Sequence, residues 1–225
     1  MSADLFGLAV TGQDVAPTPL GLGTAMAGGK GKLSSAPRAE HDYYPTPPEA
    51  TRALVEREDW TLIGGGPIWE PCGRGGAIIR VLREAGCTTI GTDIVADPEN
   101  DVAGRDLFEI DKALSKKVVT NPPFNLSAAM ILHLLDRLDV RYCAMLLKST
   151  YWHAENRTAL FRRFPPARIY ALNWRLDFIG GGAPVMECAW FVWDRRSTGP
   201  TTFDVLEKPG QSPAVADLFS PSGGT

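Results

Sequence analysis

The chain has 225 residues, of which 44% are hydrophobic and 22% charged, and its formal net charge at pH 7 is -3. This length and apolar content predict one folded domain with a substantial core. No apolar run approaches the roughly 18 residues of a membrane span and no signal-peptide pattern opens the chain, so we expect a cytoplasmic protein without membrane contact.

The two ends of the chain differ in composition from its middle. Residues 1–40 are rich in Gly, Ala, Ser, Thr and Pro, which predicts a disordered leader. Residues 209–225 have a similar composition and are expected to form a flexible tail. The folded domain is therefore predicted at 41–208.

Within these limits, apolar runs of strand length alternate with helical patterns. In chain order we expect helix 48–57, strand 68–70, helix 77–85, strand 88–92, a helical turn or two within 107–114, strand 117–120, helix 126–138, strand 142–148, helix 154–164, and final strands at 168–172 and 187–193. This alternation predicts an α/β fold with a mostly parallel sheet covered on both faces. Ligands of such sheets bind at the carboxyl ends of the strands.

The cysteines are widely spaced and form no C-x-x-C pair: Cys72, Cys87, Cys143 and Cys188. Neither a zinc site nor a disulfide scaffold is predicted, and we expect no metal. Four buried, reduced thiols are the simplest interpretation.

A glycine-rich turn joins strand 68–70 to helix 77–85, with the sequence Glu70-Pro71-Cys72-Gly73-Arg74-Gly75-Gly76. Glycines let the backbone approach a ligand closely, and free N–H groups at a helix start suit an anion. A tight turn without a ligand is the alternative.

Further polar residues follow the next strands. Asp93 ends strand 88–92, where it can accept hydrogen bonds from ribose hydroxyls, and Asp106 and Asn121 come later. We expect Glu70, Asp93, Asp106 and Asn121 to line one rim of the sheet. A nicotinamide dinucleotide is an alternative ligand, although the turn lacks the G-x-G-x-x-G spacing.

The tetrapeptide Asn121-Pro122-Pro123-Phe124 follows strand 117–120. The prolines stiffen the loop and supply no N–H. The Asn121 side-chain oxygen and the Pro122 carbonyl could then accept both hydrogens of one NH2 group, while Phe124 stacks on its ring. Helix capping by Asn121 and core packing of Phe124 are the alternatives.

With these motifs, residues 41–208 resemble class I S-adenosylmethionine-dependent methyltransferases, in particular the small DNA N6-adenine methyltransferases of phages and prophages. The segment Asn121–Phe124 is similar to the family's catalytic motif. The resemblance implies a Rossmann-like, doubly wound class I methyltransferase fold in a single domain, with S-adenosyl-L-methionine as cofactor. It also implies that the protein acts in the cytoplasm of a bacterial or phage-infected host cell.

The resemblance also implies roles for individual residues. Asp93 matches the ribose ligand and Asp106 the residue that contacts the cofactor's adenine amine, while Tyr43-Tyr44-Pro45-Thr46-Pro47 is similar to a Y-x-T-P element that holds the methionine part. The implied cofactor-binding set is Tyr44, Thr46, Pro47, Glu70, Pro71, Gly73, Gly75, Gly76, Asp93, Ile94, Asp106 and Leu107. One departure is Arg74, since the family more often has glycines four and six places after the acidic residue. Tyr43 and Tyr44 could equally clasp the leader onto the domain.

The implied reaction is an in-line methyl transfer to an exocyclic amine, driven by positioning and electrostatics without a His or Cys nucleophile. The base must leave its stack, so single-stranded substrates would be easier. The domain lacks a spare recognition block, so we expect a short or relaxed recognition sequence read by residues 150–185. An RNA base, cytosine N4 in DNA or a protein glutamine are alternative acceptors. A catalytically silent nucleic-acid-binding phage protein is a further alternative.

Basic residues gather in the later part of the chain. From Arg141 to Arg175, seven basic residues stand against Glu155 alone, which indicates either a phosphate track on DNA or RNA or a solvated basic face. Trp152-His153 could border a base pocket or join the core. Arg175 and Asp177 could belong to a substrate-side loop or form a structural pair.

Overall fold

The computed structural model describes residues 43–60, 63, 65–102, 104–182, 184 and 186–210. Residues 1–40 of the expected leader and 211–225 of the expected tail lie outside these residues. The elements in chain order are α1 (Pro48–Arg57), β1 (Ile68–Glu70), η2 (Arg74–Gly76), α2 (Ala77–Glu84), β2 (Thr89–Gly91), η3 (Leu107–Glu109), β3 (Lys117–Thr120), α3 (Ser127–Leu132), η4 (His133–Arg137), β4 (Tyr142–Lys148), η5 (Glu155–Arg157), α4 (Thr158–Arg163), β5 (Arg168–Leu172), β6 (Cys188–Asp194) and β7 (Thr202–Leu206).

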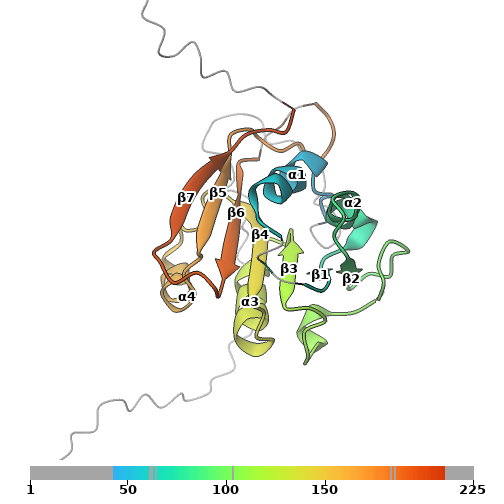
Figure 1. The fold of residues 1–225 in the computed structure, drawn as a ribbon, viewed down its shortest axis with the longest axis horizontal. Helices are drawn as coiled ribbons and strands as arrows, with labels where there is room; N and C mark the ends of the chain where they lie inside the picture. The colour runs from blue at the N-terminus through green and yellow to red at the C-terminus, as the bar shows by residue number, and fades with distance from the viewer. Residues whose placement is uncertain are drawn as a thin grey trace, which may run out of the picture. The chain divides into compact units, whose positions relative to one another are not determined.

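The strands form one mostly parallel, seven-stranded sheet in the order β2-β1-β3-β4-β6-β5-β7 (Figure 1). Only β6 runs antiparallel to its neighbours β4 and β5 among the described strands. The chain crosses from one side of β1 to the other between β2 and β3, which makes a topological switch point at their carboxyl ends. The predicted Rossmann-like, doubly wound fold is confirmed.

Helices cover both faces of the sheet. Successive residues of a strand point to opposite faces, and in this sheet both faces carry apolar side chains that must be buried. On one face, Val118, Met145 and Phe191 pack against α3, η4 and α4. On the other face, Val119 and Trp190 pack against α1 and α2. The Trp190 indole N–H donates to the Ala50 carbonyl at 2.9 Å, which fixes α1 on β6.

Several predicted elements differ from the structure. The prediction that strand 187–193 is the last strand is wrong, because β7 follows and pairs in parallel with β5. Phe203 and Val205 on β7 are 63% and 49% exposed, so this edge strand lacks the buried apolar run that marks the central strands. Helix 126–138 is divided into α3 and the π-helical η4, and only one 3-10 turn, η3, forms within 107–114.

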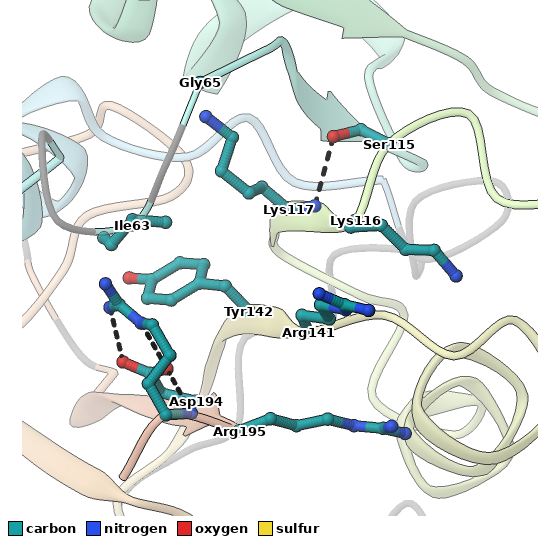
Figure 2. A pocket seen from close by; sticks show the side chains of 10 residues that line it. Ile63, Gly65, Ser115, Lys116, Lys117, Arg141, Tyr142, Asp194 and Arg195 are labelled. Atoms are coloured by element: carbon teal, nitrogen blue, oxygen red, sulfur yellow. Dashed lines mark hydrogen bonds and ion pairs between the residues drawn. The ribbon is translucent and has the colours of Figure 1, made fainter.

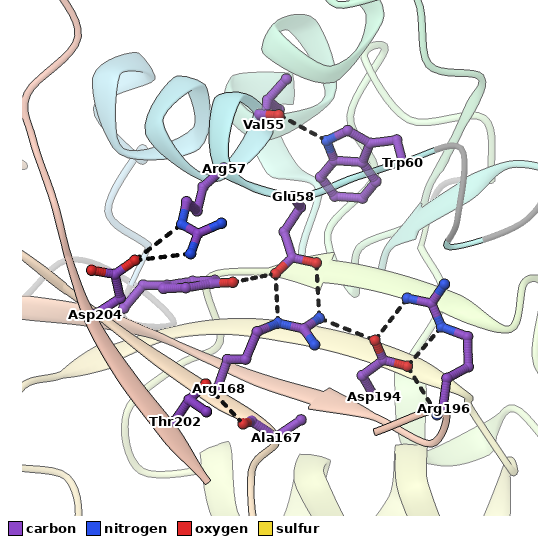
Figure 3. A network of polar contacts seen from close by, with 11 residues as sticks. Val55, Arg57, Glu58, Trp60, Ala167, Arg168, Asp194, Arg196, Thr202 and Asp204 are labelled. Carbon is purple, nitrogen blue, oxygen red and sulfur yellow. Dashed lines mark hydrogen bonds and ion pairs between the residues drawn. The ribbon is translucent and has the colours of Figure 1, made fainter. Parts of the chain in front are cut away.

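A network of charged groups joins α1 to the amino edge of the sheet (Figure 3). Arg168 donates to both oxygens of Glu58, at 2.8 and 2.9 Å, and to Asp194 at 3.0 Å. Tyr170 adds a 2.7 Å hydrogen bond to Glu58. Burial alone would raise the pKa of Asp194, but hydrogen bonds from Arg196 and Arg168 lower that pKa to about 2.

Cys143 and Cys188 are buried, whereas Cys72 and Cys87 are partly exposed, so the expectation of four buried thiols is wrong for two of them. All four are free thiols. Among the described residues, no three His, Cys, Asp or Glu side chains group in a way that could hold a metal ion. None of the described helices combines the length and the apolar character needed to cross a membrane.

Candidate active site at the carboxyl edge of the sheet

The rim of the sheet at the switch point is formed by the ends of β1 and β3. Glu70 ends β1 and Thr120 ends β3. The Thr120 hydroxyl donates to Glu70 Oε1 at 2.6 Å, so the two strand ends are joined directly. Asn121 follows at the point where the backbone leaves the sheet.

Glu70 is 1% exposed, and its two oxygens differ in their surroundings. Oε1 also accepts the Cys72 N–H at 2.9 Å, whereas Oε2 is buried without a hydrogen-bond partner among the described residues. Burial raises the pKa of Glu70 to about 8, against the smaller effect of its two hydrogen bonds. With this raised pKa the carboxyl holds a proton at neutral pH in the free protein, and a cationic ligand beside Oε2 would favour loss of that proton and leave Oε2 as its acceptor.

The amides of the glycine-rich turn are engaged within the chain. The Arg74 N–H donates to Asp93 Oδ2 at 3.2 Å and the Gly75 N–H to Asp97 Oδ2 at 3.2 Å. The Gly73 N–H donates to the Thr92 carbonyl at 2.8 Å. The expectation that this turn presents free N–H groups to an anion is wrong for these residues, because carboxylates and carbonyls of the chain already accept them.

Gly75 and Gly76 have positive φ, +66° and +61°, which side-chain-bearing residues rarely adopt. A Cβ on Gly75 would clash with the Tyr43 hydroxyl. The Arg74 guanidinium lies 4.8 Å from the centre of the Tyr43 ring, a cation–π contact. The N-terminal strap, defined here as residues 43–47, therefore packs against the glycine-rich turn.

Asn121 is held by this strap in one orientation. Its Nδ2 donates to the Tyr44 carbonyl at 3.3 Å and to the Thr46 hydroxyl at 3.1 Å. A carbonyl oxygen can only accept, so the amide nitrogen must face the strap. The Asn121 side-chain oxygen is thereby turned away from these partners as an acceptor.

The remaining predicted cofactor residues surround the same rim. Asp93 accepts the backbone N–H groups of Arg74 and Val95, and Asp106 accepts that of Phe108 at 2.9 Å, which caps η3. The Arg105 N–H donates to the Asp93 carbonyl at 2.7 Å, so the two acidic segments are adjacent. Pro71 and Leu107 are buried, Pro47 is partly buried, and Ile94 is exposed.

The aromatic part of the tetrapeptide contacts the next strand. The Lys148 ammonium group, at the end of β4, lies 5.1 Å from the centre of the Phe124 ring. The Ser127 hydroxyl donates to the Phe124 carbonyl at 2.9 Å and lies 3.0 Å from the Tyr151 hydroxyl. Pro122 is buried, while Pro123 and Phe124 are partly exposed. The ring of Phe124 therefore contacts Lys148 and is partly exposed.

The later segment is arranged differently from the predicted Arg175–Asp177 pair. Arg175 pairs with Glu187 at 2.8 Å, and Asp177 instead accepts backbone N–H groups of Ile179, Gly180 and Gly182. Desolvation raises the pKa of Asp177, but these backbone hydrogen bonds, together with one from Gly181, outweigh it and lower the pKa. Trp152 is 38% exposed and packs on Phe191, at 5.4 Å between ring centres.

Two contributors were not singled out from the sequence: Asp97 as acceptor for Gly75, and Lys148 over Phe124. Lys148 had a usable signal, because it ends the strand beside β3 and side chains at neighbouring carboxyl ends converge. Asp97 lies in a loop whose path no periodicity predicts.

The fold is one that also occurs in solved structures assigned as class I S-adenosylmethionine-dependent methyltransferases. The chain has a TM-score of 0.53 and 14% identity to a protein from Pyrococcus horikoshii assigned as an RNA methyltransferase, over 71% of this chain and 90% of that one. A protein from Listeria monocytogenes, assigned as a class I S-adenosylmethionine-dependent methyltransferase, gives a TM-score of 0.52 and 12% identity. The match covers 76% of this chain and 68% of that one.

A modification subunit assigned to a type I restriction enzyme of Vibrio vulnificus gives a TM-score of 0.49 and 14% identity, over 72% of this chain. The chain spans 47% of the length of that subunit. No protein-family model matches the sequence, and no curated protein matches it. The likenesses to the Pyrococcus and Listeria proteins establish the fold.

Proposed function

We propose that this protein is an S-adenosyl-L-methionine-dependent methyltransferase that modifies the exocyclic amine of a nucleic-acid base, with adenine N6 in DNA as the first choice. The observation that carries the proposal is the fixed orientation of the Asn121 amide. Its nitrogen is bound to the Tyr44 carbonyl and the Thr46 hydroxyl, so its oxygen is left to accept a hydrogen from a substrate amine.

The described rim fits the proposed cofactor. Glu70 Oε2 is a buried carboxyl oxygen without a partner among the described residues, and an ammonium group beside it would favour release of the carboxyl proton, so that Oε2 could accept from the ammonium end of the methionine part. Asp93 and Asp106 offer carboxylates to ribose hydroxyls and to the adenine amine, as the resemblance implies. When bound, this cofactor supplies an electrophilic sulfonium methyl group.

The chain's own groups would act by positioning. The Asn121 side-chain oxygen and the Pro122 carbonyl would hold both amine hydrogens, which favours a pyramidal nitrogen whose lone pair points at the methyl group. Phe124, partly exposed and supported by Lys148, would stack on the base after it leaves its helix. No protein nucleophile is required.

The motif indicates an exocyclic amine as the reacting group, but it does not indicate whether DNA or RNA carries the base. The Pyrococcus protein of the same fold is assigned to RNA, which makes RNA the first alternative to DNA. Residues 150–185 are proposed to read a short or relaxed sequence. The exposed parts of that segment include Trp152 and Ile179, which are 38% and 76% exposed.

The deciding experiment offers isotopically labelled S-adenosyl-L-methionine with double-stranded DNA, single-stranded DNA, RNA and protein, and identifies the modified group by mass spectrometry. N6-methyladenine in DNA, with single strands preferred, is expected. Label on cytosine N4, on RNA or on glutamine would correct the acceptor and keep the reaction class.

Asn121→Ala tests the chemistry directly. This variant should lose transfer while titration calorimetry shows cofactor binding close to that of the unaltered protein. Transfer that survives in Asn121→Ala contradicts the proposed grip. Absence of cofactor binding in the unaltered protein would instead favour a silent nucleic-acid-binding protein.

A further inference from the structure

A pocket of about 580 Å³ lies at the amino ends of β3 and β4 (Figure 2). We call it the basal pocket, and define it by Lys116, Lys117, Arg141, Tyr142, Arg195 and Arg196. Lys117 and Tyr142 are the first residues of their strands, whereas Asn121 follows the end of β3. At about 3.3 Å per strand residue, roughly 13 Å separates Lys117 from Asn121, so the basal pocket is distinct from the candidate active site.

The lining of the basal pocket is strongly cationic. Among the described residues that line it, Asp194 is the single acidic one, against five Lys and Arg side chains. Lys116 and Arg195 both pair with Asp139, and Arg196 pairs with Asp194 at 2.7 Å. These carboxylates offset only part of the positive charge. The excess creates a field that attracts anions into a concave site.

Arg141 contributes a cation that no side chain in the described part of the chain pairs with. It is exposed, and within the described ranges its guanidinium has neither an ion pair nor a hydrogen bond. Figure 2 shows the Arg141, Lys116 and Arg195 side chains extending toward one side of the view, and the Tyr142 ring toward the other. A planar guanidinium in this setting suits the oxygens of a phosphate group.

Tyr142 supplies a second, independent indication of a ligand. Its side chain is 2% exposed, yet its hydroxyl has no hydrogen-bond partner among the described residues. Burial raises its pKa well above the ordinary value, so the hydroxyl stays protonated and able to donate. Buried polar groups in proteins are almost always satisfied, so this donor, unpaired among the described residues and lining a basic pocket, suits an acceptor on a bound ligand.

Lys117 is 9% exposed, and burial lowers the pKa of its ammonium group. A bound anion would offset this desolvation. We propose that the basal pocket is a binding site for a run of phosphate groups, with the Arg141 guanidinium contacting the run from one side of the pocket and the Tyr142 hydroxyl from the other. The shared chemistry is the phosphate oxygen, carried by a free polyphosphate or nucleotide or by the backbone of a nucleic acid.

The test measures binding to the full chain by titration calorimetry at constant ionic strength with three ligands: tripolyphosphate, a nucleoside triphosphate and oligothymidylate, which has phosphodiesters but no exocyclic amine. Two variants, Tyr142→Phe and Arg141→Gln, are each expected to weaken binding about fivefold to tenfold. Arg52→Gln removes an exposed positive charge on α1 outside the pocket and should have no comparable effect.

Stability separates a lost contact from a damaged fold. Tyr142→Phe removes a hydroxyl that is unpaired in the free protein, so its urea midpoint should stay the same or rise. Sensitivity of the two free phosphates to both variants assigns the site to a free ligand, and sensitivity of oligothymidylate alone assigns it to a nucleic-acid backbone. If none of the three ligands binds, or if Arg52→Gln weakens binding as much as Arg141→Gln, the proposal is wrong. None of these measurements requires methyl transfer.

Discussion

At the scale of single residues, Thr46 and Thr51 form a matched pair. Both are buried, at 6% and 0% exposure, but Thr46 accepts the Asn121 Nδ2 while the Thr51 hydroxyl has no partner among the described residues. We expect Thr46→Val to lower the transfer rate about fivefold to tenfold, because loss of about 1 kcal/mol loosens the amide that faces the substrate.

Thr51→Val is the control for the same change of shape. It should leave the transfer rate unchanged and keep or raise the urea midpoint, since it removes an unsatisfied buried hydroxyl. Steady-state rates of both variants, with cofactor affinity measured separately, decide the question. Equal rates for Thr46→Val and the unaltered protein would show that the strap does not orient Asn121.

Glu70 gives a pH prediction at the same scale. Its pKa rises from 4.5 to about 8 on folding, because it is buried. Between these two values the unfolded chain has released the proton while the folded chain keeps it, so the free energy of unfolding falls as the pH rises through this window. The contribution is on the order of a few kcal/mol.

The measurement is urea denaturation of the protein and of Glu70→Gln from pH 4 to pH 8.5. The stability of the unaltered protein relative to the variant should fall across the window and level off above about pH 8. Two parallel curves would mean that Glu70 is ionised in the fold at neutral pH and that Oε2 is less isolated than its surroundings indicate.

At the scale of elements, the buried charged network makes the strongest stability prediction. Arg168 is 23% exposed and is shared by Glu58 and Asp194, whose side chains are 4% and 3% exposed. Arg168→Leu would leave two buried carboxylates without their main partner, and we expect a loss of about 3–5 kcal/mol in the free energy of unfolding.

Arg163→Leu is the comparison for this prediction, since Arg163 pairs with Asp136 at 2.7 Å on the surface, with side chains 61% and 49% exposed. Its loss should cost less than about 1 kcal/mol. Urea denaturation of both variants at pH 7 provides the measurement. Similar costs for the two variants would indicate that water reaches the Glu58 cluster freely.

The central elements could be predicted from the sequence because burial marks them locally. The bounds of β1, β3, β4 and β5 match the predicted strands residue for residue, since each is a short apolar run between polar or turn residues. Strand β7 could not be recognised in this way, because its exposed Phe203 and Val205 show only weak alternation beside a glycine- and proline-containing segment. Pairing with β5 decides its conformation.

In the candidate site too, some features could be predicted from the sequence and others could not. Chain order places Glu70, Asp93 and Asn121 after consecutive parallel strands, so their meeting at one rim follows from topology. The orientation of the Asn121 amide and the satisfied amides of the glycine-rich turn depend on contacts between residues far apart in the chain. Asn121 and Thr46, for example, are 75 positions apart. Local patterns carry no information about such contacts.

At the scale of the whole molecule, charge pairing limits how nucleic acid can bind. The basic segment from Arg141 to Arg175 suggested a phosphate track, but Arg163, Arg168 and Arg175 all pair with carboxylates. Those carboxylates lie outside residues 141–175 in the sequence, so the net charge of that segment does not include them. With a net charge of -3, few cations remain to release counterions from a strand.

We therefore expect binding of single-stranded DNA to depend only weakly on salt. Each phosphate contact contributes about -0.7 to the slope of log K against log salt for a single strand, so two or three contacts give a slope of about -2 or shallower. Fluorescence anisotropy between 50 and 200 mM KCl would then show an affinity loss of about twentyfold or less. Arg162→Gln should reduce the slope, because Arg162 is exposed and has no ion pair within the described ranges. Arg163→Gln, which removes an arginine already paired with Asp136, should change the slope less. A slope near -6 for the unaltered protein would show that the ion pairs of the basic segment open to form an extended phosphate track.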